Sequence, residues 1–295
     1  MKTYHDIVGD GGSDVVGQVT EQIDRLTARM ASVKHIVAVM SGKGGVGKSS
    51  VTVNLATALA SAGKRVGVMD ADINGSSIPK MLGARGKSLE RNALGVLPPQ
   101  GALGIKVMSI DFFLTNDEEP VTWDSTAKSD AYAWRGLMEA GALREMLTDT
   151  VWGDLDYLFI DVPPGTDKLT NISDVLPRLS GVVMVSIPSG VSQFIVGKSL
   201  HIANTVLEAP VVGLVENMSA YVCASCGKEE VLFPGNDLEA LAKQFEIPHL
   251  GKIPFDPRMA VAADAGEPFV VKHEALPTAE AVRQVAKRVS DFFEA

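Results

Sequence analysis

The sequence predicts an α/β fold: a single-domain, doubly wound, mostly parallel sheet of about seven strands, with helices on both faces. Three observations lead to this prediction. Apolar segments of strand length alternate with segments of helical periodicity along the 295 residues. The strand candidates are continuously apolar, as expected for strands buried on both faces. A glycine-rich segment joins one such strand directly to the helix that follows it, and no internal repeat or linker divides the chain.

Residues 1–33 are predicted to form a flexible segment followed by a helix. The beginning is polar and contains Gly9, Gly11 and Gly12. One face of the helix is apolar, and its positions are Val16, Val19, Ile23, Leu26 and Met30. Two heptads are too few for a coiled coil, so we expect this helix to pack on the domain or on a partner.

A phosphate-binding loop is predicted after the strand Ile36–Met40. The pattern of Gly, four residues, Gly, Lys and Ser spans Gly42, Lys43, Gly44, Gly45, Val46, Gly47, Lys48, Ser49 and Ser50. The backbone N–H groups of such a loop and the N-terminus of the next helix bind phosphate oxygens. Lys48 is expected to neutralise the β- and γ-phosphates, and the Ser49 hydroxyl to bind magnesium. The sequence therefore predicts a nucleotide site.

Lys43 is a second lysine in the same loop. Lys48 already serves the phosphates, so Lys43 is free to reach a nucleotide on a neighbouring chain, as an arginine finger does in trans. The alternative is a solvated surface lysine.

The remaining elements follow from apolar runs and helical spacing. Predicted strands cover residues 65–69, 105–110, 157–160, 182–187, 211–215 and 249–253. Predicted helices cover residues 77–82, 137–147, 192–208 and 238–245, and a last helix begins near Thr278. A glycine- and proline-rich loop is expected around Pro98 and Pro99, and residues 114–133 read as a polar surface loop.

Three aspartates follow predicted strands. Asp70 and Asp72 come after residues 65–69, and Asp161 after residues 157–160. Ligands of such sheets bind at the carboxyl ends of the strands. Asp161 is expected to hold magnesium and its waters. We expect Asp72 to position the attacking water, with Asp70 in a supporting role. The turn 163–166 is placed to sense the γ-phosphate, as switch loops do.

Composition limits the function classes. The formal charge of −9 argues against a general nucleic-acid binder. No apolar run approaches the roughly 18–20 residues of a membrane span, and Met1–Asp14 lacks a signal-peptide core. We therefore expect a cytoplasmic protein that binds neither nucleic acid nor membrane.

Cys223 and Cys226 form a CxxC sequence followed by Gly227, and they are the chain's two cysteines. A redox dithiol, half of a zinc site and half of an iron–sulfur site are the three possible interpretations. The polar turn that follows favours a metal over a redox helix. A tetrahedral zinc or a four-iron cluster normally takes four ligands, so full sulfur ligation requires two chains. Lys43 and the cysteine pair thus both indicate a homodimer.

With these residues in hand, the chain resembles the Mrp/ApbC family of iron–sulfur carrier ATPases, within the MinD/ParA/nitrogenase-iron-protein class that has a deviant Walker A motif. The likeness runs from about Val33 to Val271. It is carried by Gly42–Ser49, Asp70–Ile73, Ser77–Gly83, Asp161–Thr166, Glu216–Ser219, the CxxC pair and Gly251–Pro257. The domains expected are residues 1–33, a flexible segment plus helix, and residues 34–295, a P-loop ATPase domain with a metal loop near 223–226.

The resemblance implies a homodimer that bridges a [4Fe–4S] cluster through Cys223 and Cys226 of both chains. It also implies slow hydrolysis of Mg²⁺-bound ATP linked to cluster transfer to apo iron–sulfur proteins. Lys43 is implied to contact the partner's nucleotide, and Asn217 to contact adenine. The sequence departs from the family at an insertion, residues 123–133, and at Asp167-Lys168 after the turn.

Two other functions remain open at this point. A positioning switch like MinD or ParA uses the same nucleotide site to recruit partners to membrane or DNA, and it needs a basic amphipathic helix. The C-terminal helix has mixed charges, so core packing explains its apolar face better. A zinc-bridged ATPase dimer keeps the cysteines and changes only the metal.

Overall fold

A mostly parallel sheet forms the centre of the protein. The computed structural model describes residues 15–114, 131–165, 172–223, 225–234 and 237–295. Seven strands follow in the order β10-β8-β7-β1-β6-β2-β5, and all six pairings between them are parallel. Their bounds are β1 Val33–Met40, β2 Val66–Asp70, β5 Lys106–Met108, β6 Leu155–Asp161, β7 Gly181–Ser186, β8 Val211–Val222 and β10 His249–Phe255. The predicted fold class is confirmed.

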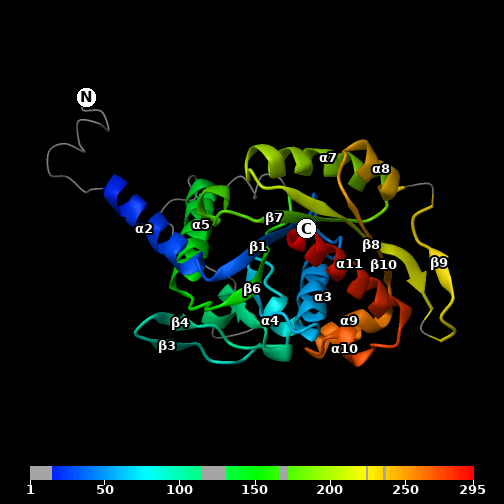
Figure 1. The fold of residues 1–295 in the computed structure, drawn as a ribbon, viewed down its shortest axis with the longest axis horizontal. Helices are drawn as coiled ribbons and strands as arrows, with labels where there is room; N and C mark the ends of the chain where they lie inside the picture. Colours follow the sequence, from blue (N-terminus) through cyan, green and yellow to red (C-terminus); the bar gives the residue numbers. More distant parts are fainter. Residues whose placement is uncertain (1–14, 115–130, 166–171, 224, 235–236) are drawn as a thin grey trace.

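Two short hairpins extend this plan. Strand β9, Glu229–Val231, pairs antiparallel with the end of β8 and makes the sheet eight-stranded. Strands β3 and β4, Glu90–Asn92 and Gly95–Leu97, form a separate hairpin within the segment that we expected to be a loop. The β8–β9 hairpin projects from one end of the molecule, opposite the end that carries α2 (Figure 1).

Helices cover both faces of the sheet (Figure 1). One face carries α2 Val15–Met30, α5 Ala131–Asp149, α7 Gly190–Thr205 and α8 Leu238–Gln244. The other carries α3 Lys48–Ser61 and α11 Pro277–Glu294, with the short α4 Ile78–Met81, α9 Pro257–Asp264 and α10 Phe269–Lys272 near α3. Three 3-10 turns complete the described elements: Ala102–Gly104, Ile110–Phe113 and Ser173–Val175.

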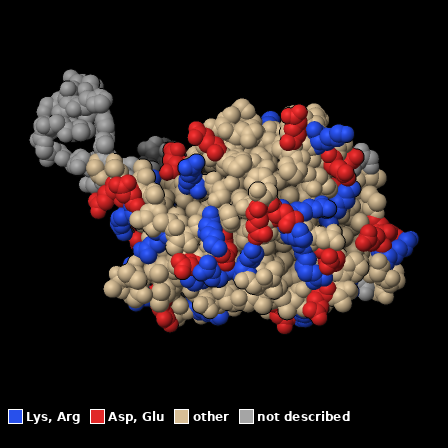
Figure 2. Space-filling model, viewed as in Figure 1, with Lys and Arg blue, Asp and Glu red and all other residues tan. Residues whose placement is uncertain are grey.

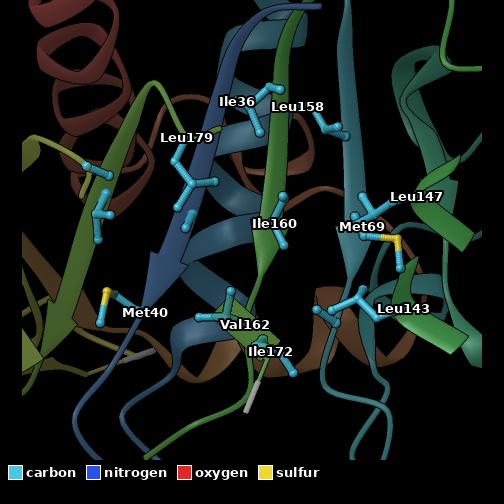
Figure 3. Close-up of a cluster of buried hydrophobic side chains, with 14 of the residues drawn as sticks. Ile36, Met40, Met69, Leu143, Leu147, Leu158, Ile160, Val162, Ile172 and Leu179 are labelled. Atoms are coloured by element: carbon cyan, nitrogen blue, oxygen red, sulfur yellow. The ribbon is translucent and has the colours of Figure 1, made fainter. Parts of the chain in front are cut away.

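The core has two layers because continuous apolar strands present side chains to both faces. Figure 3 shows one layer, where Ile36, Leu158, Ile160 and Met69 extend from three adjacent strands, and Leu143 and Leu147 of α5 lie beside Met69. The second layer includes Val37, Val39 and Phe159, packed against α3 and α11. This arrangement fixes the carboxyl ends of β1, β2 and β6 side by side.

Several predicted bounds were wrong. The strand expected at 105–110 ends at Met108, because the Ser109 hydroxyl accepts a hydrogen bond from Asp111 N and starts a 3-10 turn. The strand expected at 211–215 continues to Val222, where β9 supplies a partner. The helix expected within residues 1–33 packs on α5 with Leu26 and Met30 buried. Residues 1–14 and most of the loop expected at 114–133 lie outside the described residues.

Charges of both signs are mixed on the face of the protein that Figure 2 shows. On the face shown in Figure 2, Lys and Arg side chains alternate with Asp and Glu, and no large single-sign patch is visible. Among the described residues, no helix has the length and apolar composition that crossing a membrane requires.

Asp156 joins the starts of three strands. Its carboxylate lies 2.7 Å from Lys34 Nζ of β1 and accepts a 2.8 Å hydrogen bond from the N–H of Arg65, just before β2. Hydrogen bonds from the Arg65 side chain, then Lys34, then the Arg65 N–H hold the pKa of Asp156 below its usual range. Because the pKa is lower in the folded protein, this stabilisation is present above about pH 4 and is lost as the pH falls.

Asp156→Ala is therefore expected to lower the free energy of unfolding by about 1 kcal/mol at pH 7, since its partners are half exposed. The difference from wild type should shrink as the pH is lowered from about 5 to 3 in denaturant titrations. Asp154→Ala is the matched control, because Asp154 is more exposed and lies 3.7 Å from Arg65. Equal losses for the two variants at pH 7 would contradict the assignment.

Candidate nucleotide and thiol sites

The predicted phosphate loop connects β1 to α3 at the carboxyl edge of the sheet. Gly45 and Gly47 adopt positive φ angles of 80° and 82°, which glycine accepts without strain. Helix α3 starts at Lys48, directly after Gly47, and no side chain caps its N-terminus. The first N–H groups of α3 therefore lack an intrahelical partner and point toward the loop, where an anion binds favourably.

Asp161 is the centre of a buried polar cluster. It is fully buried at the end of β6, and its Oδ2 lies 2.7 Å from Lys48 Nζ and 2.6 Å from the Ser49 hydroxyl. The hydroxyl of Thr52 donates to Oδ1 at 2.7 Å. Parallel pairing of β1 with β6 sets this contact, because it brings the two strand ends to the same edge. The structure thus brings together Lys48, Ser49 and Asp161, as the sequence predicted.

The two other strand-end aspartates differ in environment. Asp70 is 1 % exposed, pairs in register with Asp161 and accepts hydrogen bonds from the N–H groups of Ser77 and Ile78. Burial, and then the charge of Asp161, raise the pKa of Asp70 to about 8. Asp72 lies beyond the end of β2 and is half-buried. Asp70 is therefore a buried carboxyl group with a structural role, whereas Asp72 lies at the edge of the site.

Asn217 contacts the phosphate loop from β8. Its side-chain Nδ2 donates to the carbonyl oxygen of Val46 at 2.8 Å, and the residue is 6 % exposed. A Cβ atom at Gly47 would clash with this Nδ2. The observed amide contact is thus with the loop backbone; the adenine contact implied by the resemblance remains a prediction.

The N-terminal half of the loop lies against other elements. A Cβ atom at Gly42 would overlap Ile195 of α7, so this glycine permits close packing of the loop on that helix. Pro164 lies near Gly44, and the Gly165 N–H donates to Ser41 O at 3.4 Å. Lys43 is half-buried. Of the turn expected at 163–166, Thr166 lies outside the described residues.

The cysteines lie at the tip of the β8–β9 hairpin. Cys223 directly follows β8 and is half-buried, whereas Cys226 is exposed. The Gly227 N–H donates to Cys223 O at 2.8 Å, and the Cys223 N–H to Lys228 O at 3.0 Å, so a tight turn brings the two residues together. The Ser225 hydroxyl, then the N–H groups of Cys226 and Ser225, lower the pKa of Cys223 to about 7. Thiolates are the metal-binding form of cysteine.

These residues fit a magnesium-bound nucleotide. The open space around Gly45, where an added Cβ would meet no atom, leaves room for phosphate oxygens beside the N-terminus of α3. Lys48 supplies a buried cation, and the Ser49 hydroxyl with the Asp161 carboxylate supplies hard oxygen ligands of the kind magnesium prefers.

Sequence reasoning missed Thr52 and the contact of Asn217 with the loop. Thr52 lies three residues after Ser49, so both hydroxyls face Asp161 from one side of α3. That spacing was a usable signal. The contact between Asn217 and Val46 joins residues 171 positions apart, and no local pattern indicates it.

Comparison with known proteins gives the family. The model of the ParA group described as NUBPL iron-transfer P-loop NTPase matches residues 32–290. The chain belongs to this family. It is 43 % identical over 276 residues to an iron-sulfur cluster carrier protein of Saccharolobus solfataricus, covering 93 % of this chain and 89 % of the relative. It is 38 % identical over 260 residues to a cytosolic Fe-S cluster assembly factor NUBP2 homolog of Trichoplax adhaerens, covering 86 % and 94 %.

Solved structures agree with the fold. A nucleotide-binding protein from Archaeoglobus fulgidus, in complex with ADP, superimposes with a TM-score of 0.70 at 35 % identity, covering 83 % of this chain and 91 % of that one. The cell division protein MinD of Aquifex aeolicus gives a TM-score of 0.58 at 20 % identity, covering 87 % and 97 %. The second likeness shows the fold alone. As a member of this family, the chain is a P-loop NTPase.

Proposed function

We propose that this protein is an ATP-dependent iron–sulfur cluster carrier that works as a homodimer. Two copies hold a [4Fe–4S] cluster as cargo between the Cys223 and Cys226 thiols of both chains and deliver it to apo iron–sulfur proteins. The names of the Saccharolobus and Trichoplax relatives support this function. The word cytosolic in the second name supports the cytoplasmic location expected from the sequence.

The thiol hairpin carries the proposal. It carries one half-buried and one exposed cysteine just beyond the end of a strand whose middle contacts the phosphate loop. Within the part of the chain that the structure describes, no group of three or more Cys, His, Asp or Glu residues could hold a metal. The two thiols therefore supply half of a four-sulfur ligand set, and a second copy is the simplest source of the other half.

The proposed nucleotide chemistry uses residues of the loop and the strand ends. Lys48 neutralises the β- and γ-phosphates, while Ser49 and Asp161 hold magnesium. Asp72, at the edge of the site, positions the attacking water. Lys43 reaches the nucleotide of the other copy, which makes hydrolysis depend on dimerisation and therefore slow in the isolated chain.

Anaerobic reconstitution with iron and sulfide tests the function. We expect about four irons per dimer, carried on four thiolates, and no bound iron in the Cys223→Ala/Cys226→Ala variant. Ser225→Ala is the matched control, because it changes the neighbour of Cys223 Sγ, 3.0 Å away, without removing a thiol. Equal iron in the double variant would overturn the proposal.

Elemental analysis of protein purified without oxygen separates the alternatives. Stoichiometric zinc in place of iron would indicate a zinc-bridged ATPase dimer. A MinD-like positioning switch predicts ATP-dependent sedimentation with liposomes or DNA. The mixed charges on the face in Figure 2 argue against such binding through that surface.

A further inference from the structure

Strand β8 contacts the phosphate loop and carries the cysteine hairpin at its end. Asn217 donates to Val46 O, and a Cβ atom placed on Gly47 would lie 3.4 Å from Met218 Cε. Cys223 follows Met218 by five residues, a distance of about 16 Å along an extended chain. One short stretch of backbone thus separates the nucleotide loop from the first thiol.

Met218 has an uncommon backbone conformation. Its φ angle is +55°, in the left-handed region that residues with a side chain rarely adopt. Such a conformation persists only where the surrounding structure fixes it. Here the surroundings are the phosphate loop on one side and strand β10 on the other.

The β-ladder is interrupted at the same place. Asn217 pairs with Ile253, and the next pair is Tyr221 with Phe255, so residues 218–220 lie opposite Pro254 alone. Proline has no N–H and cannot donate to the ladder. Beyond this bulge, Tyr221 stacks on Phe255 at 6.4 Å, and β9 pairs with residues 220–222. The hairpin is therefore joined to the main sheet through an irregular segment, where the ladder is interrupted and the strand bends.

We propose that Met218 is a positioning residue that couples the nucleotide state of the phosphate loop to the arrangement of the Cys223–Cys226 hairpin. This inference rests on the proposed function, since it names how the nucleotide acts on the thiols. A nucleotide that fixes the backbone around Gly47 favours one position of Met218. Through the bulge, the position of Met218 then determines the orientation of the hairpin. Coupling of this kind requires that ATP and ADP favour different arrangements.

Thiol reactivity in iron-free protein tests the coupling. The probe is the reaction rate of Cys223 and Cys226 with a disulfide reagent, measured with magnesium-bound ADP and with a non-hydrolysable ATP analogue. In the wild type we expect the two rates to differ roughly fivefold or more. Met218→Gly removes the side chain that lies beside Gly47 and frees the backbone, so the ratio should fall to about one while nucleotide affinity stays within roughly threefold.

Two variants control for indirect effects. Met218→Leu keeps a large apolar side chain at the bulge and should retain the wild-type ratio. Glu246 lies between α8 and β10 and has a similar left-handed φ angle of +56°. Glu246→Gly removes this side chain and should also retain the wild-type ratio of rates. Thermal unfolding establishes that each variant is folded before its rates are compared.

Either of two results would overturn the inference: equal rates with both nucleotides in the wild type, or an unchanged ratio in Met218→Gly. The iron-loading experiment is separate. Absence of iron on the thiols would refute the carrier function but would leave the iron-free coupling measurable. Normal iron loading with an unaltered ratio in Met218→Gly would refute the coupling alone.

Discussion

Asp161→Asn is expected to reduce ATP hydrolysis by about 100-fold or more. The substitution keeps the size of the side chain but removes the charge that lies 2.7 Å from Lys48 Nζ and 2.6 Å from the Ser49 hydroxyl. An amide binds magnesium more weakly than a carboxylate does, so a magnesium ion bound at Ser49 and residue 161 would be held less firmly. The measurement is steady-state phosphate release over a range of magnesium concentrations.

Stability should change as well. Lys48 is 6 % exposed, and the substitution removes the carboxylate charge beside it. Breaking such a buried ion pair by removing one partner costs on the order of 3–5 kcal/mol of stability. Part of this loss is offset, because Asp161 no longer raises the pKa of Asp70. Asp174→Asn, at an exposed position, is the control. Hydrolysis by Asp161→Asn within roughly threefold of wild type would exclude the assigned role.

Gly47→Ala is expected to abolish nucleotide binding at micromolar concentrations and to destabilise the fold by roughly 2–4 kcal/mol. Two effects combine. Alanine is strained at φ +82°, and its Cβ would clash with Asn217 Nδ2. Relief of the clash requires Asn217 to release the Val46 carbonyl, which shifts the loop. Titration with a fluorescent ATP analogue and chemical denaturation measure the two effects.

Gly63→Ala separates strain from contact. Gly63 has nearly the same φ, +84°, but an added Cβ would meet no atom within 4 Å. The Gly63→Ala variant should therefore lose about 1–2 kcal/mol of stability and bind nucleotide normally. In Gly47→Ala/Asn217→Ala the clash is gone, so binding should recover in part. If Gly47→Ala and Gly63→Ala behaved alike, the Asn217 contact would have no role in holding the loop.

The amino-acid sequence was sufficient for the class of fold and for the parts of the site that are continuous in the chain. Gly45, Gly47, Lys48 and Ser49 lie in one segment, where residue type and spacing decide the backbone angles and the donors. Continuously apolar strands that alternate with helices similarly allow few arrangements other than a parallel sheet covered on both faces.

The tertiary structure alone decided the contacts between distant segments. Strand β8 continues to Val222 because β9 pairs with it. Strand β9 contains two exposed glutamates and has no apolar pattern that would predict a strand. Asn217 contacts Val46 because of the order in which the strands are placed in the sheet. Local propensity does not encode that order. It results from the simultaneous burial of both faces of the sheet, which depends on the whole chain.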